Sequence, residues 1–155
     1  MNELFKQLTH GVYVVAVSDG EHSSAFTAAW IMQVSFKPPL LAISINPENY
    51  SYTLLKKTGV CTVNVLSENQ LAIAGHFGKS HKDKMAGFNW QQGKTFVPFL
   101  SESLAYFDCQ VSNYVEAGDH TIAIFKVLDG KILNQSDKPL LYSQTGNMDE
   151  SQTLY

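Results

Sequence analysis

Apolar residues come in short runs along this chain, and turn-forming residues separate the runs. Residues 12–17 are apolar throughout, which is typical of a strand buried on both faces. Asp19-Gly20 then predicts a tight turn, and Lys37-Pro38-Pro39 predicts a break in regular structure. Further strands are expected at residues 25–32, 40–45 and 60–66.

Short segments at residues 2–9, 51–57 and 70–77 have helical spacing instead. Ser51 is the expected N-cap of the second of these helices, and Gly59 is the residue at which it stops. Ser67 and Gln70 have the spacing of a capping box at the start of the third helix.

Two long strands are expected near the C-terminus, over residues 104–115 and 121–127, joined through Gly118. A further turn is expected at Asp129-Gly130, whereas residues 78–99 are polar and predict irregular structure. Many strands at short spacing with few short helices predict a mainly β fold, a closed antiparallel barrel with peripheral helices. No repeat or linker divides residues 1–155, so a single domain is expected.

Asp119 and His120 stand side by side where the last long strand begins. Strand openings favour β-branched and aromatic residues and disfavour Asp, so packing alone does not explain the pair. An imidazole at such a place can donate a hydrogen bond to a ligand, and the adjacent carboxylate can fix its tautomer. The alternative is that Asp119 caps the turn and His120 is a half-exposed turn residue.

Charge narrows the possible partners of the chain. Charged residues make up 16% of the sequence, below the ~25% of a typical soluble domain, which favours an oligomer with a covered surface. The net charge of −3 argues against nucleic acid as the main ligand. All 11 basic residues are Lys, so a phosphate would be held by Lys, hydroxyl and backbone groups rather than by Arg.

The two cysteines, Cys61 and Cys109, lie in apolar strand-like runs and are expected to be buried free thiols. The N-terminus has no signal-peptide pattern, and no apolar run approaches membrane length, so a cytoplasmic protein with no membrane partner is expected. The histidines lack the spacing of a metal site, and none is expected.

Several segments have side chains suited to a ligand. The small residues of Thr27-Ala28-Ala29-Trp30 allow a flat aromatic ring to approach the backbone, although a crowded strand crossing would need them too. Residues 46–53 lead from a strand end into a helix N-terminus, a position that favours an anion, although simple capping by Ser51 explains this equally well. Residues 79–84 carry the densest positive charge, in what is either a phosphate contact or a solvated loop.

In their order, these segments resemble the flavin reductase-like family, an FMN-binding split barrel that includes small reductase components of two-component monooxygenases and flavoredoxin-type proteins. The resemblance covers residues 8–142. It is carried by Thr9-x-Gly11-Val12-Tyr13-Val14-Val15, Phe26-Thr27-Ala28-Ala29-Trp30, Ser35-x-x-Pro38-Pro39, Asn46 with Thr53, Val63-Asn64-Val65-Leu66, Phe77-Gly78, Asp83-Lys84-Met85 and Gly118-Asp119-His120.

The resemblance implies a Greek-key-like split barrel that forms a homodimer with FMN at the subunit interface. The backbone of residues 27–30 would meet the flavin ring, and His120, oriented by Asp119, would lie near the nicotinamide of NADH or NADPH as a hydrogen-bond donor. The remaining implied cofactor contacts are Ser35, Asn46, Ser51, Tyr52, Thr53, Phe77, Lys82 and Lys84, of which the 46–53 segment and Lys82 or Lys84 would meet the phosphate.

The function implied is transfer of a hydride from NAD(P)H to FMN, with FAD as a possible substrate, and then of electrons to a second acceptor. That acceptor would be a monooxygenase component or a redox protein. The absence of Arg favours NADH over NADPH slightly. Two alternatives stay open: an FMN electron carrier that receives electrons from a protein partner without NAD(P)H, and an FMN-binding module with a structural or regulatory role.

Overall fold

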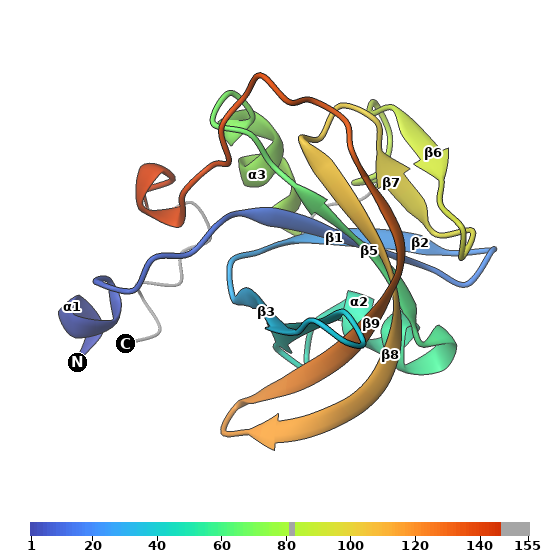
Figure 1. Cartoon of the computed structure of the whole chain (residues 1–155), viewed down its shortest axis with the longest axis horizontal. Coiled ribbons are helices and arrows are strands. Elements are labelled where there is room, and N and C mark those ends of the chain that lie inside the picture. The colour runs from blue at the N-terminus through green and yellow to red at the C-terminus, as the bar shows by residue number, and fades with distance from the viewer. Residues whose placement is uncertain (81–82, 147–155) are drawn as a thin grey trace.

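A computed structural model describes residues 1–80 and 83–146 (Figure 1). The α-helices are α1 (Asn2–Phe5), α2 (Tyr50–Thr58) and α3 (Leu71–Phe77), and a 3-10 turn η1 covers Tyr142–Gln144. The strands are β1 (Tyr13–Ser18), β2 (Ser23–Ala28), β3 (Ile31–Ser35), β4 (Leu40–Ile45), β5 (Val60–Val65), β6 (Trp90–Gln92), β7 (Pro98–Leu100), β8 (Ala105–Ala117) and β9 (His120–Ile132).

Seven strands form one antiparallel sheet in the order β2-β1-β5-β8-β9-β4-β3, and β6 pairs with β7 separately. The mainly β prediction is confirmed. The sheet curls strongly along β8 and β9 (Figure 1), yet within the described residues β2 and β3 remain unpaired edges. The prediction of a closed barrel is therefore wrong in that respect, and the sheet is an open, split barrel.

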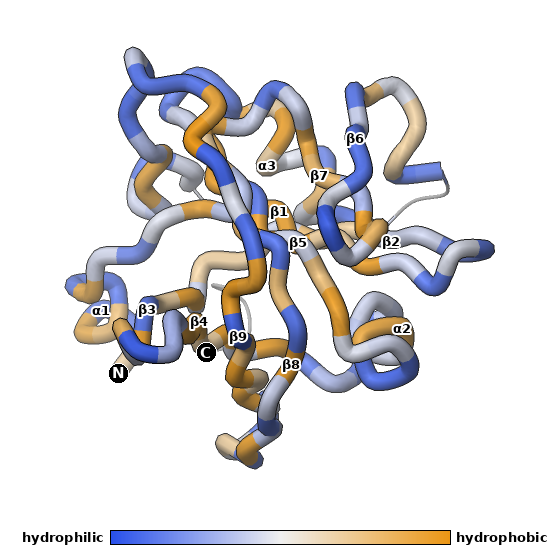
Figure 2. The backbone as a smooth tube through the Cα atoms, turned by 45° about the vertical axis from the view of Figure 1, so that its right-hand side comes forward, coloured by the Kyte–Doolittle hydropathy of each residue, from blue (hydrophilic) through white to orange (hydrophobic). Residues whose placement is uncertain are grey.

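The core lies on both faces of β1, as the continuous apolar run at residues 12–17 predicts. Val15 and Val17 point into one cluster with Leu54 of α2, and Val14 points into a second cluster with Phe77 of α3. Figure 1 shows β1 and β5 between the two helices. Strand β9 carries the hydrophobic run Ile122-Ala123-Ile124-Phe125 (Figure 2), of which only Ala123 and Phe125 are fully buried, because these two side chains share the face that packs on the core.

Helix α2 begins one residue earlier than expected, and its cap is a different residue. The Asn49 side chain accepts a hydrogen bond from the backbone N–H of Ser51 at 2.9 Å, so Asn49 is the N-cap and the assignment of Ser51 to that role is wrong. Gly59 ends the helix with φ of 71°, as predicted. Before α3, the Gln70 side chain accepts from the N–H of Ser67 at 2.9 Å, which is half of the expected capping box.

Several boundaries differ from the expectation. Residues 78–99 are not wholly irregular, because they contain β6 and the start of β7. Asp129-Gly130 is not a turn, since β9 runs through it; a Cβ at Gly130 would lie 2.7 Å from the carbonyl oxygen of Tyr106, so glycine permits a close strand approach there. The expected strand at residues 25–32 is interrupted at Ala29-Trp30.

The predicted burial of the two thiols is confirmed: Cys61 and Cys109 are free, fully buried and opposite each other in the β5–β8 pair. Among the described residues, no helix has the length and apolar character needed to cross a membrane.

Candidate functional site

A cavity of about 880 Å³ opens beside β2, the N-terminal end of α2 and the C-terminal end of α3. Four of the predicted cofactor residues line it: Thr27, Asn46, Phe77 and Lys84. They come from a strand, a strand end, a helix and a loop, so only the folded chain brings them together. The size is within the ~300–1,000 Å³ of typical small-molecule sites.

Thr27 connects two walls of this cavity. Its hydroxyl donates a hydrogen bond of 2.6 Å to the carbonyl of Ala74, which fixes β2 against α3. Phe77, three residues further along α3, is buried beneath the cavity and packs against Phe88 at a ring distance of 5.0 Å. The hydroxyl of Thr27 is thus engaged in the fold.

Only part of the strand-to-helix segment, residues 46–53, lines the cavity. The Asn46 side chain accepts from the N–H of Glu48 at 3.0 Å and lines the cavity. The Ser51 hydroxyl is buried and donates to the hydroxyl of Ser24 at 2.9 Å. Tyr52 packs toward the core against Tyr114, with their rings 6.2 Å apart.

Of the other predicted contacts, Ser51, Tyr52, exposed Thr53 and Ser35 on the edge strand β3 are not among the residues lining this cavity. The cavity instead uses Ser24, which sequence analysis missed, together with Asn49 and Tyr50, which lie within the predicted 46–53 segment but were not singled out in it. The Asn-x-Ser spacing at residues 49–51, which is typical of an Asx cap, was the available signal for Asn49.

Both signs of charge surround the cavity. Glu21, Glu48 and Asp83 provide carboxylates, and Lys79 and Lys84 provide ammonium groups. Burial lowers the pKa of Lys84, and no carboxylate of the described residues lies within ion-pair distance of it. An anionic ligand would relieve this partly desolvated charge. Lys82, the other predicted phosphate contact, lies outside the described residues.

His120 opens β9 directly after a turn in which Gly118 has φ of 66°. Its Nδ1 lies 2.8 Å from Oδ1 of Asp119, and this hydrogen bond lowers the pKa of the Asp119 carboxyl. The indole of Trp30 lies against the imidazole, with ring centroids 5.0 Å apart and planes inclined by 49°. The three residues form one group at the end of the sheet.

The register of β4 and β9 joins this group to the cavity. Ile45 pairs with Thr121, so Asn46 on the cavity wall follows opposite His120. The backbone N–H of Ser44 also donates to the carbonyl of Trp30 at 3.0 Å. The imidazole therefore lies near the cavity wall at one end of β4, although neither His120 nor Trp30 is among the residues that line the cavity.

The two alanines between these parts differ in their surroundings. Ala28 ends β2 with its side chain in the core cluster, where it pairs with Tyr13. Ala29 is half-buried and lies in the break between β2 and β3. Neither alanine is among the residues that line the cavity. Among the described residues, no group of three or more His, Cys, Asp or Glu side chains is arranged to hold a metal ion.

Known proteins share this architecture. The chain is 33% identical over 128 residues to a Rhizobium meliloti protein named "Probable flavin reductase", covering 82% of this chain and 41% of that one. It is 29% identical over 136 residues to the flavin-dependent monooxygenase reductase subunit HsaB of Rhodococcus jostii, covering 88% of this chain and 69% of that one.

Among solved structures, the NADH:FAD oxidoreductase SgcE6 of Streptomyces globisporus superposes with a TM-score of 0.86 at 26% identity, over 93% of this chain and 87% of that one. The chain spans between 22% and 61% of the length of three curated relatives that it matches. The family model described as the flavin reductase like domain matches residues 5–150. The chain therefore belongs to the flavin reductase-like family.

Proposed function

We propose that this chain binds FMN in the cavity beside β2 and α2, takes a hydride to it from NAD(P)H, and supplies the electrons to a second acceptor. The observation that carries the proposal is the end of β4, where Asn46 lies on the wall of a cavity that also holds the half-buried ammonium group of Lys84, and where the oriented imidazole of His120 stands on the neighbouring strand. Flavin, when bound, supplies the redox chemistry, and the chain supplies binding and orientation.

The donor set fits an FMN phosphate at one end of the cavity. Lys84 offers a positive charge that has no carboxylate partner among the residues described. The N-terminus of α2 lies on the same cavity through Asn49 and Tyr50, and its dipole favours an anion. Glu21 would repel the phosphate from the β1–β2 turn.

Asp119 gives His120 a definite role toward the nicotinamide. A carboxylate only accepts hydrogen bonds, so Nδ1 of His120 carries a proton in their 2.8 Å contact. In the neutral imidazole, Nε2 is then an acceptor rather than the donor expected from the sequence. As an acceptor, Nε2 of His120 can take a hydrogen bond from the N–H group of a nicotinamide carboxamide. Hydride transfer itself requires no acid or base here, so His120 orients its partner.

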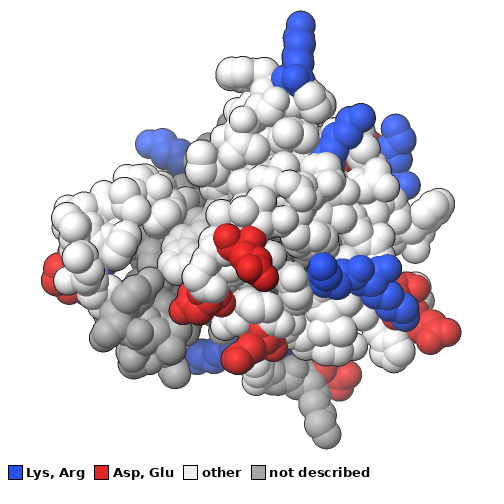
Figure 3. Space-filling model, turned by 90° about the horizontal axis from the view of Figure 1, so that it is seen from below, with Lys and Arg blue, Asp and Glu red and all other residues white. Residues whose placement is uncertain are grey.

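A homodimer is part of the proposal. Large apolar side chains are exposed on α1 and on the edge strand β3, including Leu4 at 66% and Phe36, just after β3, at 84%. Much of the face in Figure 3 carries neither acidic nor basic side chains. Such surfaces favour burial against a second copy. Light scattering is expected to give twice the chain mass of 17.2 kDa, and a monomer with full flavin content would refute the dimer.

Anaerobic titration of the FMN-loaded protein with NADH and then NADPH tests the function. Direct loss of the oxidised flavin absorbance is the expected result, with NADH more effective because the chain lacks Arg for a 2′-phosphate. Reduction only through another redox protein would instead indicate an electron carrier, and no reduction by either would indicate a structural FMN module.

The relative HsaB supports a monooxygenase component as the acceptor. Addition of such a component with its substrate tests that acceptor, and parallel loading with FAD tests the choice of flavin.

A further inference from the structure

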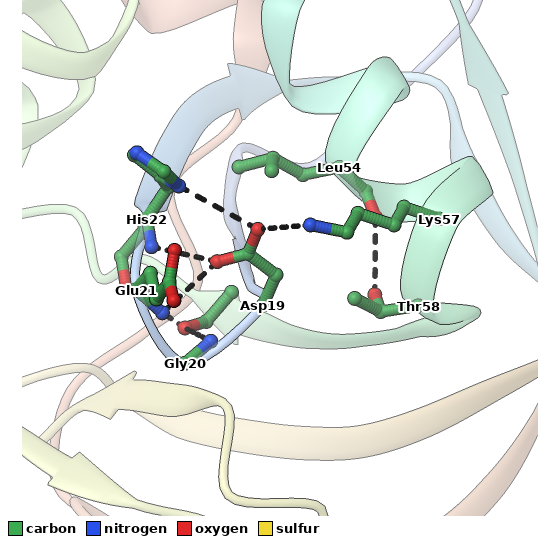
Figure 4. A network of polar contacts seen from close by, with 9 residues as sticks. Asp19, Gly20, Glu21, His22, Leu54, Lys57 and Thr58 are labelled. Carbon is green, nitrogen blue, oxygen red and sulfur yellow. Dashed lines mark hydrogen bonds and ion pairs between the residues drawn. The ribbon is translucent and has the colours of Figure 1, made fainter.

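One carboxylate organises the turn between β1 and β2 (Figure 4). Oδ1 of Asp19 accepts hydrogen bonds from the backbone N–H groups of Glu21 at 3.0 Å and His22 at 2.6 Å. Its Oδ2 accepts from Nζ of Lys57 at 2.7 Å, and Nδ1 of His22 lies 3.6 Å from the same atom. The Asp19 side chain is only 5% exposed, although this turn lies at the surface.

These contacts connect two elements that border the proposed flavin cavity. The β1–β2 turn leads directly to Glu21 and Ser23, which line one rim. Helix α2 contributes Asn49 and Tyr50 to the adjoining rim, and Lys57 lies in the last turn of that helix. The ion pair between Asp19 and Lys57 therefore joins the two rims at a point outside the cavity.

A second link lies at the other end of α2. There the buried Ser51 hydroxyl donates to the hydroxyl of Ser24 on β2 at 2.9 Å. Helix α2 is thus attached to the β1–β2 hairpin near both of its ends. Without the Lys57 link, the last turn of α2 would lose its polar attachment to the hairpin and would be held by the core contacts of Leu54 and Leu55.

We infer that Asp19 and Lys57 are positioning residues, which fix the separation of the β1–β2 turn from α2 and thereby the affinity of the cavity for flavin. This inference rests on the proposed function. Neither side chain is among the residues lining the cavity, so neither touches the ligand. Their effect is on the geometry that Glu21, Ser23, Asn49 and Tyr50 present to it.

The charge state of the pair supports a permanent link. The hydrogen bond from Lys57, with those from the backbone of the turn, holds the pKa of Asp19 well below its usual range. The carboxylate is therefore ionised throughout the range in which flavin reduction is measured. The Lys57 ammonium is 66% exposed, so water and salt weaken the pair, and a modest effect is expected.

The test compares Lys57→Met with Lys56→Met in the whole chain. Both remove one positive charge from the last turn of α2, but only the first breaks the pair with Asp19. Lys57→Met is expected to raise the Kd for FMN up to about threefold to fivefold, the size of an exposed ion pair, and to lower the melting temperature by a few degrees at most. Lys56→Met is expected to bind FMN as the wild type does, and Lys57→Arg to restore binding.

Asp19→Asn completes a double-mutant cycle. The Asn side chain keeps an oxygen for the two turn N–H groups and loses the charge that Lys57 pairs with. The double variant is therefore expected to bind FMN no more weakly than either single variant. Additive losses, or a Kd for Lys57→Met equal to that of the wild type, would overturn the inference.

A flavin-independent readout separates this inference from the function it rests on. Spin labels at Glu21→Cys and Tyr50→Cys report the distance between the rims, because the native cysteines are buried. Lys57→Met is expected to broaden this distance distribution and Lys56→Met to leave it unchanged. An unchanged distribution refutes the positioning role even if the wild type fails to bind FMN, whereas that failure alone refutes the proposed function.

Discussion

The Nδ1 atom of His120 lies 2.8 Å from Oδ1 of Asp119, although the Asp119 side chain is 98% exposed. Exposed neighbours on a surface turn rarely need such an arrangement for stability. Here the contact fixes which imidazole nitrogen carries the proton, and Trp30 restricts the ring from one side. The two residues are best understood as one orienting unit.

Replacing His120 tests that unit at the coenzyme. His120→Ala is expected to raise the KM for NADH about threefold to tenfold, the effect of one lost hydrogen bond, and to leave the Kd for FMN unchanged. Steady-state kinetics and a flavin titration measure the two quantities. A fall in kcat beyond a hundredfold at constant KM would assign His120 to the transition state instead.

Asp119→Asn tests the tautomer. The amide can present either its oxygen or its NH₂ group, so it no longer dictates the protonated nitrogen of His120. We expect a rise in the KM for NADH smaller than that of His120→Ala and no further loss when the two changes are combined. Independent, additive losses would show that Asp119 acts on the ligand by another route.

Lys84 predicts a dependence of FMN affinity on pH. Burial lowers its pKa, and a bound phosphate favours the charged amine, so affinity is full below that lowered pKa and falls as pH rises through it. Titrations above pH ~7, where the phosphate has already lost its second proton, isolate this effect. Lys84→Met is expected to weaken binding and remove the dependence, whereas Lys94→Met, at an exposed position, serves as the control.

Larger side chains at Ala28 and Ala29 should have different effects, one on stability and the other on FMN binding. Ala28→Leu overfills the core and is expected to cost about 1–3 kcal/mol of unfolding free energy, read from chemical denaturation. Ala29→Leu is expected to spare stability and to weaken FMN binding by more than ~1 kcal/mol, because its side chain would enter the space beside the ring. Normal flavin content in Ala29→Leu would place the ring elsewhere.

Asp108 provides a stability prediction away from the cavity. This buried carboxylate accepts hydrogen bonds from the backbone N–H of Thr95 at 2.8 Å and from the Thr95 hydroxyl, and so anchors the β6–β7 turn. Asp108→Ala leaves both donors without their acceptor and is expected to cost about 1–3 kcal/mol. Thermal unfolding measures the loss, and FMN affinity at a temperature where the variant is folded should be unchanged.

The sequence predicts the strands of this fold better than it predicts the cavity. The continuous apolar run at residues 12–17 predicted β1 well, because burial on both faces leaves an unambiguous pattern. Strands β4 and β5 were also predicted well, although β4 buries only alternate residues. The turn predicted at Asp129-Gly130 is absent, because the same dipeptide that suits a turn also permits the close approach of β9 to Tyr106. The cavity could not be predicted in detail, because its walls depend on contacts such as that of Thr27 with Ala74.

The order of strands in the sheet has a consequence for biosynthesis. Strand β1 pairs with β5, β5 with β8, and β4 with β9, so three of the six ladders in the seven-stranded sheet wait for a segment made much later. Trp30 meets His120 only after β9 has left the ribosome. Non-local pairing of this kind is slow, and until it is complete the edges of β1 and β4 are open to other chains. The nascent protein is therefore most vulnerable to aggregation before the hairpin that carries His120 closes the sheet, and a truncation before β9 should be insoluble as well as inactive.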